Sequence, residues 1–78
     1  MTLNVIIATV MLYETKDITI TEVLEKCKKI YKYMMYCKIE TNMTLEPQQT
    51  IVERNLHALG YTFENRGKKI CIVKKTPV

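Results

Sequence analysis

Apolar residues between positions 23 and 35 recur every three or four residues, the period of an α-helix that buries one face. Thr19 and Glu22 have the spacing of a capping box, and Thr21 offers a second position for the N-cap. Glu22 and Glu25 stand in the first turns and the lysines follow, which matches the helix macrodipole. The pattern predicts a helix whose apolar stripe is Val23, Leu24, Cys27, Ile30, Tyr31, Met34 and Met35.

A second amphipathic segment follows Pro47, a residue that the first turn of a helix tolerates. Its expected N-cap is Thr44 or Glu46, and Gly60 stands where the left-handed residue that ends many helices is expected. The predicted apolar stripe is Val52, Leu56 and Leu59, flanked by Ile51 and Ala58.

Alternating apolar and polar residues after this helix predict two β-strands. Tyr61 and Phe63 alternate with polar neighbours on the first strand, and Ile70 and Ile72 do so on the second. Residues 65–67, with the sequence Asn-Arg-Gly, are predicted to form the turn of a hairpin.

Residues 3–13 fit two structures. Leu3, Ile6, Ile7 and Val10 follow helical spacing, whereas the valine, isoleucine and threonine content also suits a buried strand. We interpret the segment as a helix that is apolar on most of its surface. Such a helix has to be packed against other elements on more than one side, and a domain of this size has only a small core. The sequence therefore favours a homodimer formed through this helix.

Residues 17–20 alternate polar and apolar side chains and predict a short strand, while residues 37–43 lose periodicity and predict a loop or a short extended segment. The expected order is therefore helix, short strand, helix, helix and β-hairpin. No internal repeat or linker divides the 78 residues, which are enough for one domain.

The stretch TIVERNLHALGY resembles the recognition helix of the winged helix-turn-helix superfamily, and TFENRGKKICIVKK resembles its basic wing. The resemblance implies an α+β winged helix over residues 1–78, with three helices, a short strand, a C-terminal β-hairpin and a frayed tail at 76–78. In that superfamily the third helix enters the major groove and the hairpin lies on the adjacent backbone. The segment joining the second and third helices is longer here than the turn of a compact helix-turn-helix.

The net charge of +4 is unevenly distributed, because two groups of basic residues contain no acidic residue between their members. The first group is Lys26, Lys28, Lys29, Lys32 and Lys38, and the second is Arg66, Lys68, Lys69, Lys74 and Lys75. Such segregation suits a phosphate backbone, although lysines also solubilise small domains.

Helical geometry places the polar residues of the third helix opposite its apolar stripe, where they face outward. Glutamine and arginine form paired hydrogen bonds with adenine and guanine, and cations at the hairpin tip would meet phosphates or the minor groove. Glu53 is expected to pair with His57 or Arg54 or to accept from a cytosine amine. The predicted DNA contacts are Gln49, Thr50, Arg54, His57, Arg66, Lys68 and Lys69.

The sequence favours no enzyme, since no phosphate-loop, dinucleotide, metalloprotease or nucleophile-elbow motif occurs. No cofactor, small-molecule substrate or metal is expected. Cys27, Cys37 and Cys71 are odd in number and form no CxxC pair, which favours reduced thiols. The apolar run 3–13 is shorter than the roughly 20 residues that span a bilayer. We therefore expect no membrane contact and an intracellular location, in the cytoplasm, nucleoid or nucleus.

Double-stranded DNA binding by a small transcription or replication regulator, from a virus, phage or other compact genome, is the favoured function. A winged-helix interaction module that binds no DNA would instead use the first helix and Met34, Met35 and Tyr36. Single-strand or RNA binding through tyrosines and lysines is the third alternative. The lysines interleaved with the tyrosines on the second helix favour core-rim or partner-surface roles for these rings.

Overall fold

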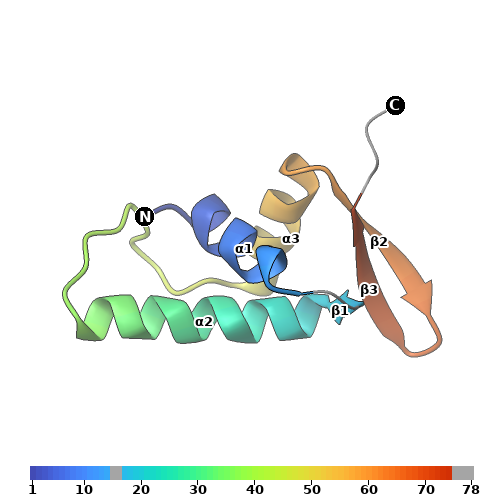
Figure 1. Cartoon of the computed structure of the whole chain (residues 1–78), viewed down its shortest axis with the longest axis horizontal. Helices are drawn as coiled ribbons and strands as arrows, with labels where there is room; N and C mark the ends of the chain where they lie inside the picture. The colour runs from blue at the N-terminus through green and yellow to red at the C-terminus, as the bar shows by residue number, and fades with distance from the viewer. Residues whose placement is uncertain (15–16, 75–78) are drawn as a thin grey trace.

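The computed structural model describes residues 1–14 and 17–74 and has an α+β fold of three helices and a three-stranded antiparallel sheet (Figure 1). The elements, in chain order, are α1 (Leu3–Leu12), β1 (Ile18–Thr19), α2 (Ile20–Tyr36), α3 (Gln49–Ala58), β2 (Tyr61–Arg66) and β3 (Lys69–Lys74). The predicted order of elements is confirmed, and it is compatible with a winged-helix-like layout. The predicted fraying of residues 76–78 lies outside the described residues.

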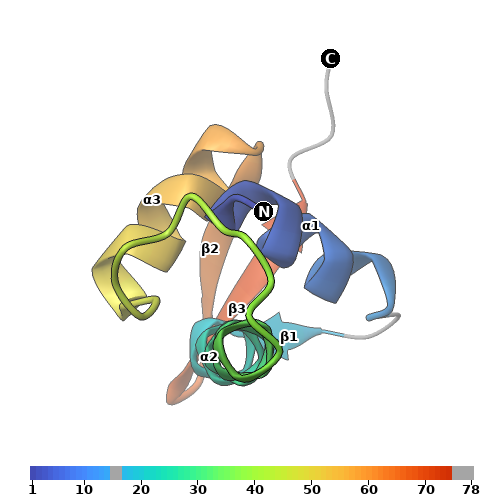
Figure 2. The ribbon, with the colours of Figure 1, turned by 90° about the vertical axis from the view of Figure 1, so that its left-hand side faces the viewer.

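The first segment is the helix α1, and the strand alternative is excluded. Thr2 caps it, because its hydroxyl accepts a hydrogen bond from the Val5 amide at 3.4 Å. The predicted apolar face is buried and packs on both α2 and α3 (Figure 2). Val5 and Leu12, on other sides of α1, stay 46% and 76% exposed, so one copy of the chain covers this helix only in part and the homodimer remains a prediction.

Helix α2 begins where the capping pattern predicted. Thr19 is the N-cap, and its Oγ1 accepts from the Glu22 amide at 3.2 Å. Met34 is only 2% exposed and belongs to the core, so it cannot take part in the predicted partner surface. Met35 and Tyr36, the other members of that surface, are exposed.

Helix α3 starts later than predicted, because Pro47 is used as a core residue rather than as a helical one. The Pro47 ring is fully buried, and Gln48 after it is still extended, with φ −118° and ψ 153°. Gln48 is therefore the N-cap, without a side-chain cap bond, and neither Thr44 nor Glu46 occupies that position.

The apolar stripe of α3 is narrower than predicted. Val52 and Leu56 are fully buried, whereas Leu59 is 38% exposed and forms the C-cap, where the chain leaves the core. Gly60 follows with φ +92°, which confirms its predicted role in ending the helix.

The strand order is β1-β3-β2, so β3 is central and pairs with both neighbours. The hairpin turn is Gly67-Lys68, not residues 65–67, since Arg66 is the last residue of β2 and pairs with Lys69. Gly67 has φ +67°, and a positive φ at the first loop position is what a two-residue II′ turn requires. This register also sets Phe63 opposite Ile72, which orients both toward the same face.

The core combines buried residues of α1, α2 and α3 with Ile18 of β1 and Ile72 of β3. Cys27 of α2 is completely enclosed there, and burial raises the pKa of its thiol to about 11. Cys71 is buried as well, while Cys37 at the end of α2 is exposed, and all three thiols are free.

We expect Leu56→Ala to lower the free energy of unfolding by about 2–5 kcal/mol, because it leaves a cavity beneath α3. Leu59→Ala serves as the matched control and should cost less than about 1 kcal/mol, since that side chain is partly in solvent. Urea unfolding followed by circular dichroism measures both. Equal losses for the two variants would contradict the position of α3 on the core.

Cys27 and Cys37 should differ sharply in their rates of reaction with a disulfide reagent at mildly alkaline pH. Cys37 should react at once, whereas Cys27 should react only on unfolding, because the thiolate is the reactive form and burial raises the pKa of Cys27. Thiol release measured in native buffer and in urea, with Cys37→Ser as control, checks this. Rapid native labelling of Cys27 would show that α2 does not pack as described.

Candidate nucleic-acid interface

The outward face of α3 carries three of the polar side chains that the sequence assigned to DNA contact, Thr50, Arg54 and His57, and a fourth, Gln49, is the first residue of the helix. Val52 and Leu56 fix the opposite side of the helix in the core, so the direction of this face is set by packing. All four side chains are exposed: Gln49, Thr50, Arg54 and His57.

Two of these side chains have partners within the chain. Gln49 Nε2 donates to Glu53 Oε1 at 3.1 Å, so Glu53 pairs one turn back and not with the predicted His57 or Arg54. His57 Nδ1 lies 3.4 Å from the Tyr61 carbonyl oxygen, a hydrogen bond when that nitrogen carries the proton. Both contacts hold a polar side chain against the surface of α3 and leave it accessible.

A hollow of about 310 Å³ joins the start of α3 to the hairpin tip. Gln49 lines it from α3, and Lys68 and Lys69 line it from the hairpin. Thr21 and Glu22 of α2 form another wall, so one carboxylate also faces the space. The fold therefore brings two separate parts of the predicted site, the helix start and the hairpin lysines, around one opening.

Arg66 does not line this hollow and contacts two carboxylates instead. Its guanidinium binds the carboxylate of Asp17, and its Nη2 lies 3.2 Å from Glu64 Oε2. Arg66 and Glu64 stand at alternate positions of β2 and thus on one face of the sheet, and Asp17 directly precedes β1. Arg66 bridges the outer strands and is not equivalent to its lysine neighbours.

The hairpin lysines differ from Lys26, Lys32 and Arg66 in their surroundings. Within residues 1–14 and 17–74, ion pairs engage Lys26 with Glu14, Lys32 with Glu46 at 3.8 Å, and Arg66, but not Lys68 or Lys69. Lys75 falls outside the described residues. Among the described residues, ion pairs therefore offset the positive charge of Arg66 but not that of Lys68 and Lys69.

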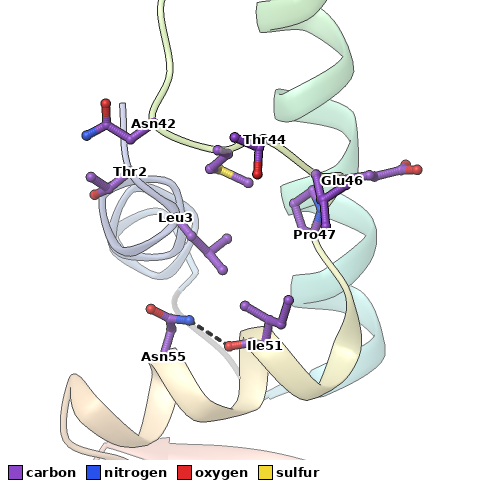
Figure 3. A pocket seen from close by; sticks show the side chains of 10 residues that line it. Thr2, Leu3, Asn42, Thr44, Glu46, Pro47, Ile51 and Asn55 are labelled. Carbon is purple, nitrogen blue, oxygen red and sulfur yellow. Dashed lines mark hydrogen bonds between the residues drawn. The ribbon is translucent and has the colours of Figure 1, made fainter.

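A second hollow, of about 380 Å³, lies between the start of α1, the segment before α3, and α3 itself (Figure 3). Leu3, Pro47 and Ile51 supply apolar walls, and the Asn55 amide donates to the Ile51 carbonyl at 2.7 Å. Glu46 points away from the centre of the space (Figure 3). This hollow has no charged group turned into it in the view shown, so it offers little to an ionic ligand.

The described part of the chain has neither a metal-site cluster nor a membrane-spanning helix. No group of three His, Cys, Asp or Glu side chains there has the arrangement of a metal site. None of the helices in residues 1–14 and 17–74 is long and apolar enough to cross a membrane.

Sequence reasoning missed the role of Asp17. Its contact with Arg66 joins residues 49 positions apart, and it depends on the β1-β3-β2 order, which no local pattern specifies. The one available signal was the alternation of residues 17–20, which sets Asp17 and Thr19 on the face opposite Ile18.

Comparison with known proteins gives no relative for this chain: no family model, curated protein or solved structure matches it.

A double-mutant cycle of Asp17→Asn and Arg66→Gln should give a coupling energy of about 0.2–1 kcal/mol, because both side chains are about half exposed and solvent screens them. Urea unfolding of the wild type, both single variants and the double variant measures it. The looser Lys32–Glu46 pair, replaced by Gln in both positions, is the control and should couple more weakly. A coupling energy of zero for Asp17 and Arg66 would mean that Arg66 is free at the hairpin.

Proposed function

We propose that this chain is a winged-helix module that binds double-stranded DNA, with α3 in the major groove and the hairpin on the adjacent backbone. The observation that carries the proposal is the hollow in which Gln49 of α3 meets Lys68 and Lys69 of the hairpin. A groove-reading helix and a backbone-binding hairpin have to approach the same stretch of duplex, and this arrangement meets that requirement.

The dimensions of α3 support the proposal. Ten residues make a helix about 15 Å long, and the major groove of B-DNA, about 12 Å wide, admits one α-helix. Arg54, Thr50 and His57 lie near the middle of the exposed face, opposite the buried Val52 and Leu56. Arg54 has the paired donors that read guanine.

In this proposal, the hairpin contacts the phosphates of the DNA and does not read the bases. Lys68 in the turn and Lys69 at the start of β3 are exposed cations suited to phosphate oxygens. Arg66, which the sequence placed beside them, has a different role in this proposal, since its bonds to Asp17 and Glu64 orient the hairpin. The module would act inside the cell as a small regulator of transcription or replication.

Lys68→Gln together with Lys69→Gln should weaken duplex binding and reduce the salt slope by about one unit for each phosphate that is no longer neutralised. Fluorescence anisotropy with a labelled duplex at about 50 and 200 mM salt measures both quantities. The charge-matched control is Lys29→Gln with Lys32→Gln, on α2 away from the hairpin. Equal effects of the two pairs would reduce the binding to general charge attraction and contradict the proposal.

Arg54→Gln adds a test of base reading. It should cost about 1–3 kcal/mol on preferred sequences and little on others, which a selection from random duplexes followed by titration would show. A uniform loss on all duplexes would assign Arg54 to the phosphate backbone instead.

A further inference from the structure

Four exposed residues of α2 form one stripe on the helix surface. Their positions are related as i, i+3, i+4 and i+7, a spacing that puts all four on one side of a helix. This side is opposite to the buried Val23, Cys27 and Met34. We define the tyrosine-lysine stripe as Lys29, Lys32, Tyr33 and Tyr36.

The tyrosines of this stripe have no part in the core. Tyr33 is 64% exposed and Tyr36 is 87% exposed, although each ring carries a large apolar surface. The Cys37 side chain lies one turn further along α2, and its hydrogen bonding and charge raise the pKa of Tyr33. The rings are therefore presented to solvent on a rigid element.

The charged groups around the rings are mainly positive. Lys29 has no ion pair within the described residues, and Lys32 has one, with Glu46 at 3.8 Å. Both members of that pair are exposed, so the contact is weak and Lys32 stays available to another anion. Two more acids stand close to the stripe: Glu25, one turn before Lys29 on the same side of α2, and Glu14, which lines a hollow together with Lys29.

The stripe lies away from the proposed duplex interface. The C-terminal half of α2 extends to one end of the molecule, and the hairpin stands at the other (Figure 1). Seen from that end, α2 projects toward the viewer and the hairpin is behind it (Figure 2). One rigid duplex segment held by α3 and the hairpin tip would leave this surface open.

We propose that the tyrosine-lysine stripe is a second binding surface, for single-stranded nucleic acid. Bases stack on exposed aromatic rings irrespective of sequence, and neighbouring lysines neutralise the phosphates between them. Side chains three residues apart on a helix have Cβ atoms about 5–6 Å apart, so two neighbouring nucleotides of one strand can reach Tyr33 and Tyr36. A purely apolar partner would gain nothing from the two lysines, which favours a polyanion with flat apolar faces.

The test uses the full chain and fluorescently labelled oligo-dT and oligo-U of about 12 nucleotides, within the range of single-strand site sizes. Tyr33→Leu with Tyr36→Leu should weaken binding about tenfold or more, because leucine keeps the helix but removes the stacking surface. Tyr33→Phe with Tyr36→Phe should bind within about twofold of wild type, since the ring remains. Phe63→Leu, which replaces a partly exposed aromatic ring on β2 away from the stripe, is the control and should have no effect.

Two further arms separate the stripe from the hairpin. Lys68→Gln with Lys69→Gln should leave oligonucleotide affinity within about twofold, whereas Lys29→Gln with Lys32→Gln should reduce it and lower its salt slope. Comparison of oligo-dT with oligo-U shows whether DNA or RNA is preferred, and either preference supports the proposal.

The proposal is overturned if the leucine pair binds oligonucleotides as the wild type does, or if the wild type binds neither oligomer. If the chain instead self-associates in sedimentation and the leucine pair does not, the stripe is an interface between copies, and the nucleic-acid proposal is also overturned. None of these results bears on duplex binding by α3, which the hairpin variants test separately.

Discussion

The packing of α1 against both α2 and α3 is the contact on which the rest of this structure depends. An isolated helix of ten residues is unstable in water, so α3 exists because Val52 and Leu56 are buried beneath it. The same burial decides which side of α3 faces solvent. The proposed groove-reading surface is therefore a consequence of apolar packing on the reverse side of the helix, not of any attraction among its polar residues.

Features governed by near neighbours in the chain were predictable from the sequence. The period of α2, its cap at Thr19 and the left-handed Gly60 all follow from residues a few positions apart. The sequence did not show that Pro47 fills the core, that Leu59 leaves it or that Asp17 binds Arg66, because each depends on packing between distant segments. For the predicted site, the helical period was enough to predict which side chains of α3 are exposed. That Arg66 binds Asp17 could be predicted only with knowledge of the strand order.

Runs of like charge in the sequence proved a poor guide to charge on the surface. Each basic block contains cations that meet a carboxylate from another part of the chain, as Lys26 meets Glu14 and Arg66 meets Asp17. Ion pairs within the described residues engage neither Lys68 and Lys69 at the hairpin tip nor Lys29 on α2. The net charge of +4 thus does not show by itself where positive charge is exposed.

Thr19 ends β1 and also caps α2, so the sheet passes into the longest helix without a single linking residue. No hinge is available at that junction, and a rotation of the sheet has to carry α2 with it. On the hairpin side, the chain reverses in two residues, where Gly67 has φ +67°. A force applied to the hairpin by a bound surface would therefore pass through β3 and β1 directly to the start of α2.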